Sequence, residues 1–145
     1  MHDASNGWVG GDDGAFYRTD DGWATWSFPS GCTLPPGLNS SADPQDVYKI
    51  KFHDPLNGFF AADYGHAYRT SDGGCTWIRA QIFGPLCFSG APETHNLEFW
   101  DFEFSPADPS LGWMAGGYGI QEGFIFGTDD GGANWDVSSC FGLSS

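Results

Sequence analysis

The feature that most constrains this 145-residue chain is a segment that occurs three times. When the sequence is shifted by 51 residues, Asn6 to Trp26 aligns without a gap with Asn57 to Trp77, and 11 of the 21 positions are identical. A third copy begins at Leu111, carries four extra residues at 120–123 and rejoins the pattern at Phe124. A fixed period of this kind is typical of folds that stack copies of one supersecondary unit.

Each copy predicts a meander of short strands. Alternating apolar residues and turn signals predict strands at 46–52, 58–63, 66–70 and 75–80 in the second copy, and at 99–104, 112–117, 123–128 and 133–138 in the third. The first copy holds only the last three strands, because six residues precede Gly7. No segment has the apolar spacing of an amphipathic helix.

These meanders favour an all-β fold. A single four-stranded sheet with two apolar faces is not stable in water, but such sheets become the blades of a β-propeller when they stack around an axis. We expect a β-propeller arc of about three four-stranded antiparallel blades, the first incomplete, in a single repeat domain over residues 1–145. The blades are expected at 6–30, 46–83 and 98–139, and a two-sheet sandwich is the alternative fold.

The last hairpin of every copy contains the pattern Ser/Thr-x-Asp-x-Gly-x-Thr-Trp. The residues that fit it are Thr19, Asp21, Thr25 and Trp26 in the first copy, Thr70, Asp72, Gly74, Thr76 and Trp77 in the second, and Thr128, Asp130, Gly132 and Trp135 in the third. Asn134 stands at the second Thr position of the third copy. Trp23 replaces the second glycine of the first copy, and we expect that turn to have a different backbone shape.

The motif residues suit a structural role better than catalysis or metal binding. A short carboxylate at a tight turn accepts hydrogen bonds from nearby N–H groups, glycine adopts a positive φ, and threonine bonds back across the turn. The tryptophan that follows begins the next strand and packs between sheets. The four histidines fall at unrelated repeat positions, so we predict no metal site, no cofactor and no catalytic role for the motif.

This pattern is the Asp-box, also called the bacterial neuraminidase repeat. The wider phrases NGWVGGDDGAFYRTDDG, NGFFAADYGHAYRTSDGG and LGWMAGGYG…FIFGTDDGG resemble the repeats of photosystem II stability and assembly factor-like proteins. Sialidases, sortilin-type receptors and xyloglucan-cleaving glycosidases share the motif and the propeller. The resemblance implies a propeller fold, and because this fold hosts many activities it implies less about function.

Charge and cysteine content narrow the partners and the compartment. The net charge of −14, with five Lys and Arg in total, argues against nucleic acid and anionic membranes, and no apolar run is long enough for membrane insertion. Five Lys and Arg residues are also too few to form much of the basic surface patch that is associated with the photosystem II assembly factor-like proteins. The opening residues lack the features of a signal peptide.

Four cysteines are an even set, which favours disulfides and an extracytoplasmic chain, whether secreted, periplasmic or lumenal. They are Cys32, Cys75, Cys87 and Cys140, and buried free thiols are the alternative. Cys75 has no cysteine counterpart in the other two copies, and we expect it to bond to Cys87.

Two classes of function remain. We expect a non-enzymatic binding or assembly scaffold that contacts a partner through the long inter-blade loops at 28–45 and 81–98. The open faces of a three-blade arc call for a covering, which makes a longer propeller, a protein partner or self-association the expected solutions.

A carbohydrate-active propeller, binding glycans or cleaving glycosides, is the alternative. Arg18 and Arg69 share one repeat position, which argues against the arginine triad of sialidases. A glycosidase carboxylate pair remains open among Asp54, Asp63, Asp101, Glu103, Asp108 and Glu122. Trp23, Trp100 or Trp113 could stack on sugar rings if exposed, although the strand positions of Trp100 and Trp113 favour a place in the core.

Overall fold

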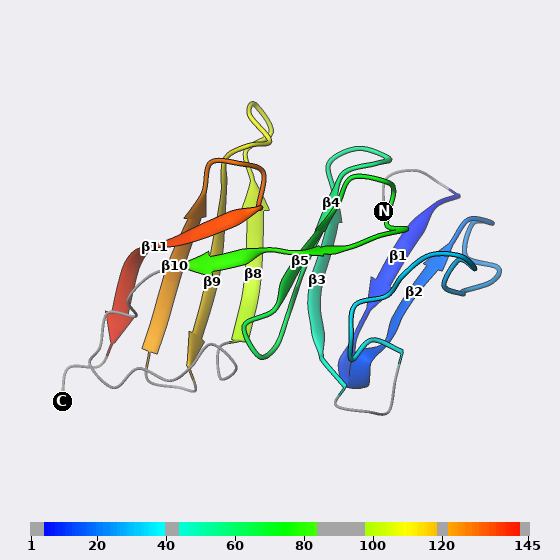
Figure 1. Ribbon diagram of the computed structural model, residues 1–145, viewed down its shortest axis with the longest axis horizontal. Helices are drawn as coiled ribbons and strands as arrows, with labels where there is room; N and C mark the ends of the chain where they lie inside the picture. Colours follow the sequence, from blue (N-terminus) through cyan, green and yellow to red (C-terminus); the bar gives the residue numbers. More distant parts are fainter. Residues whose placement is uncertain (1–4, 40–43, 84–97, 119–121, 143–145) are drawn as a thin grey trace.

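The computed structural model describes residues 5–39, 44–83, 98–118 and 122–142, and its regular secondary structure consists almost entirely of strands in three sheets (Figure 1). Blade one is β1 (Gly7–Gly10) and β2 (Phe16–Thr19). Blade two is β3 (Val47–Phe52), β4 (Gly58–Ala62), β5 (Ala67–Thr70) and β6 (Ile78–Arg79). Blade three is β8 (Glu98–Phe104), β9 (Gly112–Tyr118), β10 (Glu122–Thr128) and β11 (Asn134–Gly142), with β7 (Gln81–Phe83) added at its edge.

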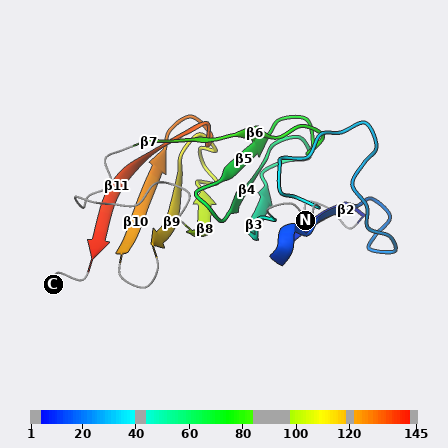
Figure 2. The same ribbon diagram turned by 60° about the horizontal axis from the view of Figure 1, so that its bottom comes forward.

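The three sheets stand side by side in chain order and form a partial propeller arc, which confirms the predicted all-β fold (Figures 1 and 2). The one helical element among the described residues is a short 3-10 turn, η1 (Asp12–Gly14), between β1 and β2. The described residues contain no helix that is both long and apolar enough to span a membrane.

Two strand predictions need correction. Blade three has five strands, because β7 leaves blade two and pairs in parallel with the start of β11. The segment from Ile78 to Phe83 therefore bridges two blades, and the change of partner falls at the buried Ala80, whose N–H still donates to Ala67. Figure 2 shows this segment running from β6 in blade two to β7 in blade three.

In blade one, the expected last strand is reduced to a single bridge between Arg18 and Ser27. The ladder cannot continue, because the next residue in register, Pro29, has no N–H to donate. The backbone of Phe16, which would face it, is instead bonded by the side chain of Asn39, at 2.9 Å from the Phe16 N–H and 2.5 Å to its carbonyl.

The middle blade is buried on both faces. Every residue of β4 is buried, and neighbouring side chains point to opposite sides as strand geometry requires. Phe60 packs toward blade one with Phe16, whereas Phe59 packs toward blade three with Phe102 and Trp135. The described residues therefore form two hydrophobic cores, one at each seam between blades.

The two seams repeat one packing arrangement. In each repeat the second strand, which is β1 in blade one and β4 in blade two, carries an aromatic side chain at its second position. This side chain, which we call the seam aromatic, inserts into the next blade. Trp8 lies 5.9 Å from the rings of both Phe52 and Trp77, and Phe59 lies 5.5 Å from Phe104 and 5.4 Å from Trp135. These paired rings, together with a glycine of the same blade, form what we call the acceptor site.

The acceptor glycines are Gly74 and Gly132. Both have a positive φ, 90° and 91°, and a Cβ added at Gly74 would overlap the Trp8 ring. A Cβ at Gly132 would lie 3.1 Å from the Phe59 ring, tighter than ordinary van der Waals contact. Glycine is therefore required twice over, by backbone conformation and by the close approach of the seam aromatic.

Gly31 meets only the first of these two requirements. It has φ 83°, but the space where a Cβ would lie is open. We expect Gly31→Ala to lower the free energy of unfolding by about 1 kcal/mol, from backbone strain alone. Gly74→Ala should cost about 2–4 kcal/mol, because the same strain is joined by overlap with Trp8. Urea unfolding of both variants measures the difference, and equal losses would contradict the proposed seam packing.

Candidate functional site

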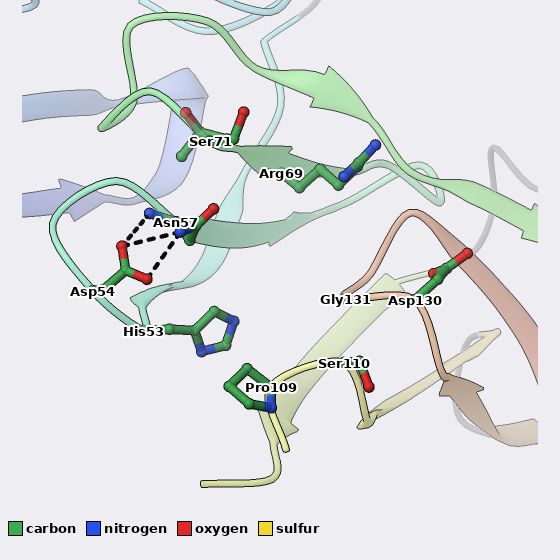
Figure 3. Close-up of a pocket in the computed structure, with 11 residues that line it drawn as sticks. His53, Asp54, Asn57, Arg69, Ser71, Pro109, Ser110, Asp130 and Gly131 are labelled. Atoms are coloured by element: carbon green, nitrogen blue, oxygen red, sulfur yellow. Dashed lines mark hydrogen bonds between the residues drawn. The ribbon is translucent and has the colours of Figure 1, made fainter. Parts of the chain in front are cut away.

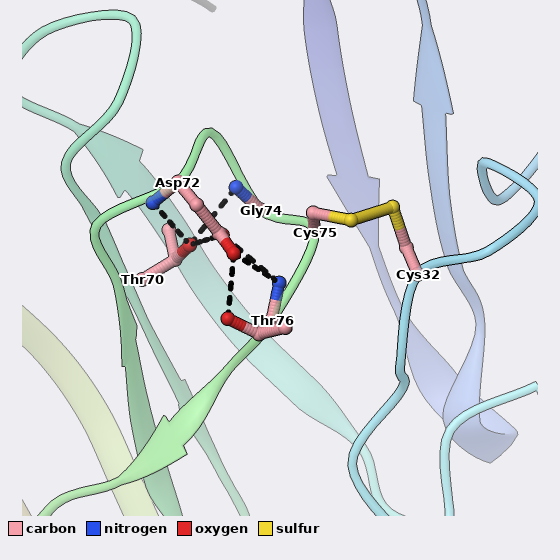
Figure 4. Close-up of a disulfide and its surroundings, with 6 residues drawn as sticks. All are labelled: Cys32, Thr70, Asp72, Gly74, Cys75 and Thr76. Carbon is pink, nitrogen blue, oxygen red and sulfur yellow. Dashed lines mark hydrogen bonds between the residues drawn. A yellow bond between two sulfur atoms is a disulfide. The ribbon is translucent and has the colours of Figure 1, made fainter.

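The motif hairpins, Thr19–Trp26, Thr70–Trp77 and Thr128–Trp135, join the last two strands of each copy. In blade two, the Thr70 hydroxyl donates to the Asp72 carboxylate at 2.8 Å and accepts the Gly74 N–H at 2.9 Å. Asp72 in turn accepts both the N–H and the hydroxyl of Thr76, at 2.9 Å and 2.6 Å (Figure 4). All of these bonds stay within one turn.

The other two hairpins repeat this network. Asp130 accepts from the N–H and side-chain amide of Asn134, so asparagine supplies the donors that threonine supplies elsewhere. In the first hairpin, the Trp23 N–H donates to Thr19 at 3.1 Å, and Trp23 adopts φ 82°. The expectation of a different backbone shape at Trp23 is therefore wrong, because the turn's hydrogen bonds impose the same conformation on a residue that is not glycine.

These bonds stabilise the ionised carboxylates. Hydrogen bonds from Thr25 lower the pKa of Asp21 to about 2. Burial opposes ionisation of Asp72, but the bonds from Thr76 and Thr70 outweigh it and lower the pKa of Asp72 to about 2. The pKa of Asp130 is also lowered, because the bonds from Asn134 and Thr128 outweigh the effect of burial. Such carboxylates carry no proton to donate near neutral pH.

A disulfide joins Cys75 of the second hairpin to Cys32, which corrects the expected Cys75–Cys87 pairing (Figure 4). The Thr33 N–H also donates to the Cys75 carbonyl, and Leu38 is buried in the core between blades one and two. The loop after blade one is thus drawn across the first seam. Cys87 lies outside the described residues, as does 84–97 of the second long loop, and the side chain of Cys140 is likewise not described.

A cavity of about 340 Å³ opens between blades two and three at the end of the sheets that carries the motif hairpins. Blade two contributes the β3–β4 turn, with His53, Asp54 and Asn57, and the end of β5 with Arg69. Figure 3 shows Pro109, Ser110 and Gly131 of blade three across the cavity from them, whereas the neighbouring Asp130 carboxylate points away and bonds to Asn134. The two turns are brought together by the insertion of Phe59 beneath them.

Arg69 is the cation of this cavity. It pairs across the strands with Phe59, so it projects from the face of blade two that packs against blade three. Its Nε atom is buried and has no hydrogen-bond partner among the described residues. Arg18, at the same repeat position, instead bonds to Asn6 at 3.4 Å and lies over the Trp8 ring. The two arginines therefore meet different surroundings at one repeat position.

The acids of the cavity are poor proton donors. Hydrogen bonds from the Asn57 side chain and from the Leu56 and Asn57 N–H groups lower the pKa of Asp54, as the network of the third motif hairpin does for Asp130. Burial lowers the pKa of His53, whose ring packs edge-on against Phe104 at 4.6 Å. The cavity thus holds one cation, two stably ionised carboxylates and a neutral imidazole, which is the chemistry of a polar binding site.

The structure describes the side chains of five of the six carboxylates proposed for glycoside cleavage, and it places Asp101 and Glu103 together around Lys49. Asp101 and Glu103 bond to Lys49 and Lys51 of β3, which lowers both pKa values. Hydrogen bonds from Ser110 lower the pKa of Asp108. The side chain of Glu122 is not described. Asp63 alone among the five described residues has a raised pKa.

Asp63 lies at the opposite end of blade two, in the turn between β4 and β5. Burial, reinforced by the charges of Asp46 and Glu98, raises the pKa of Asp63 to about 6. Its Oδ1 atom is buried without a hydrogen-bond partner among the described residues. The same surroundings raise the pKa of Tyr48 to about 12, chiefly through burial and the charge of Glu98. This end of the seam therefore disfavours negative charge.

The three tryptophans considered for sugar stacking are all about half exposed, at 52% for Trp23, 47% for Trp100 and 52% for Trp113. They lie on a motif hairpin of blade one and on β8 and β9 of blade three, so none lines the cavity. The cavity itself was missed by the sequence analysis. Its one signal in the sequence was the position directly before the motif. Arginine stands there in the first two copies, as Arg18 and Arg69, and Gly127 stands there in the third.

The fold defines the class of this protein as a β-propeller arc. No protein-family model matches the chain, and no curated protein matches it. Among solved structures, the chain is similar to YCF48 bound to D1 peptide, at 22% identity and a TM-score of 0.62 over 97% of this chain and 40% of that one. It is also similar to an ancestral GH74 enzyme, at 15% identity and a TM-score of 0.68 over 100% of this chain and 18% of that one.

These likenesses support the predicted resemblance to propeller proteins at the level of the fold. The chain spans less than half the length of either structure, so it corresponds to part of each propeller. The described disulfide fits an extracytoplasmic location.

The disulfide should contribute to stability through chain entropy. The bond closes a loop with a sequence separation of 43, for which the entropic limit is about 4 kcal/mol. We expect Cys32→Ser, Cys75→Ser and the double variant each to lose about 2–4 kcal/mol in urea unfolding. The double variant should lose no more than either single variant, because one bond is removed in all three. Additive losses would argue against the Cys32–Cys75 pairing.

Asp63 predicts an unusual pH dependence of stability. Because its folded pKa of about 6 exceeds the ordinary 3.8, ionisation of Asp63 destabilises the fold as pH rises between these values. Asp63→Asn should therefore raise the free energy of unfolding at pH 7 by on the order of 1 kcal/mol, after allowance for solvent screening. The gain should vanish below about pH 4.

Asp54→Asn is the control of opposite sign. The lowered pKa of Asp54 means that its ionised form stabilises the fold at pH 7 and that this contribution is lost on acidification. Urea unfolding from pH 3 to pH 8 checks both variants. A loss of stability in Asp63→Asn at pH 7 would show that the buried carboxylate is not a destabilising charge.

Proposed function

We propose that this protein is a non-enzymatic binding scaffold that takes a peptide segment of a protein partner in the cavity between blades two and three. The observation that carries this proposal is the buried Arg69 Nε without a partner among the described residues, in a cavity whose acids are held ionised. An unused charged donor favours an acceptor from a ligand, either a backbone carbonyl or a carboxylate. Asp54 and Asp130 favour donors, such as peptide N–H groups.

The comparisons support this proposal in one respect. YCF48, a structure with the same fold, is bound to a D1 peptide, so a propeller of this kind accepts a peptide. The cavity is lined by three turns from two blades, and each turn is held by a backbone N–H that donates to its own carboxylate, Asp54, Asp108 or Asp130. A preformed site of this kind loses little entropy on binding.

This proposal places the contact on a surface other than the inter-blade loops that the sequence favoured, of which 84–97 lies outside the described residues. The loop at 28–39 is held by the disulfide and by Leu38, so it serves the first seam and presents little that can rearrange around a partner. We therefore place the peptide contact on the β3–β4 and β8–β9 turns and on the motif hairpin of blade three.

Arg69→Gln tests the proposal, with Arg18→Gln as the matched control at the same repeat position. A displayed library of random peptides, supplemented with the D1 peptide, is selected on the wild-type chain. Peptides that bind should lose about tenfold or more in affinity for Arg69→Gln, because one charge-assisted hydrogen bond is removed, and should bind Arg18→Gln unchanged. Selection of no peptide, or equal affinity for both variants, would contradict the proposal.

A carbohydrate-active propeller is the second candidate. Asp63 favours it, because a carboxyl with a pKa near 6 has the property of a general acid, and the ancestral GH74 enzyme shares the fold. A panel of oligosaccharides separates the candidates. Release of reducing sugar that is lost in Asp63→Asn and kept in Arg69→Gln would favour the glycosidase, whereas no hydrolysis and no quenching of tryptophan fluorescence would leave the peptide scaffold.

A further inference from the structure

The outer face of blade three presents a third seam aromatic. Trp113 occupies the position of Trp8 and Phe59, directly after the glycine that begins strand two. Its neighbour Met114 is buried in the core shared with blade two, so Trp113 projects from the opposite face of the sheet. Trp113 is 52% exposed, whereas Phe59 is 1% exposed.

The surroundings of Trp113 form a shallow surface of apolar residues and two carboxylates. Ala115 and Ile125 pair across β9 and β10 on the same face, and they line a hollow of about 170 Å³ with Trp113 and with Asp101 and Glu103 of β8, whose carboxylates bond to Lys49 and Lys51. Gly127, which pairs with Trp113, has open space where a Cβ would lie. The position that holds Arg69 in blade two therefore adds no charge here. The outer face of blade three therefore presents a seam aromatic that could pack against a further blade, as those of blades one and two do.

A second copy of this chain would offer part of an acceptor site, Trp26 of the first motif hairpin, because the described residues before β1 form no strand equivalent to the one that carries Phe52. Trp23 stands at the acceptor-glycine position of that hairpin. The Trp23 ring lies edge-on to Trp26 at 5.4 Å, much as Trp8 lies edge-on to Trp77 at 5.9 Å. Trp23 therefore packs against the motif tryptophan of its own hairpin, as a seam aromatic does in the other seams. A side chain larger than hydrogen is incompatible with the insertion seen at Gly74.

We propose that the outer face of blade three binds a further propeller blade whose motif hairpin carries glycine at the position of Gly74 and Gly132, and that Trp23 excludes a second copy of this chain from that face. The proposal extends an interface that the molecule already forms twice, at Trp8 and at Phe59. The net charge of −14 acts in the same direction, because two copies repel one another. This proposed interface is independent of the peptide cavity at Arg69.

The test opens the acceptor site of blade one by Trp23→Gly. The open probe is the full chain with Trp23→Gly and Trp113→Ala, which gains an acceptor glycine beside Trp26 and cannot self-associate through its own seam aromatic. The reference probe carries Trp113→Ala alone. Each is passed over immobilised wild-type chain at raised ionic strength, where charge repulsion is screened. The open probe should bind at least about tenfold more tightly than the reference probe.

Variants of the immobilised chain complete the test. Trp113→Ala should abolish binding of the open probe, and Trp113→Phe should restore it, because Phe59 fills this place in the second seam. Trp100→Ala is the control, since Trp100 is similarly exposed but has no place in the repeated packing. Equal binding of the two probes, binding that survives Trp113→Ala, or no binding of the open probe would each overturn the proposal.

Discussion

The insertion of one aromatic ring from each blade into the next is the interaction on which this structure depends. Trp8 and Phe59 each lie against a phenylalanine and a tryptophan of the following blade, over a glycine that lets the ring approach the backbone. Stacked sheets hold together only if their faces exclude water, and large rings bury much apolar area per residue. The two hydrophobic cores are built around these insertions.

The motif carboxylates support this packing indirectly, through the turns that carry the acceptor glycines. Asp72 and Asp130 close the turns that carry the acceptor glycines, and the threonine hydroxyl at the start of each turn holds the glycine N–H directly. The network fixes the positive φ at that position so firmly that Trp23 adopts it as well. The acidic residues therefore organise the aromatic seams, and their low pKa values are a consequence of the same hydrogen bonds.

The seams also create the two unusual electrostatic sites of the chain. Insertion of Phe59 brings the β3–β4 turn of blade two opposite the motif hairpin of blade three, and Arg69 is left between them with a buried donor. At the other end of blade two, closure of the sheets buries Asp63 near other carboxylates, which raises its pKa. One end of the structure therefore favours a polar ligand, and the other resists negative charge.

Local sequence determined the strands and turns of blades two and three, because alternation, Gly-rich turns and the motif act within a few residues of one another. It also indicated the stacking of blades, since the repeat would be unstable as separate sheets. The sequence could not place β7, whose parallel partner β11 lies far along the chain, and it could not pair Cys75 with Cys32.

Tertiary structure alone decided what each repeated residue meets. Arg18 and Arg69 are equivalent in sequence, yet one lies over Trp8 and the other faces a cavity, because the neighbouring blades differ. Trp8 and Trp113 are equivalent too, yet Trp8 is packed against the next blade and Trp113 is exposed. A repeat determines the unit and its period, whereas burial, charge and function depend on the surface that lies opposite each unit.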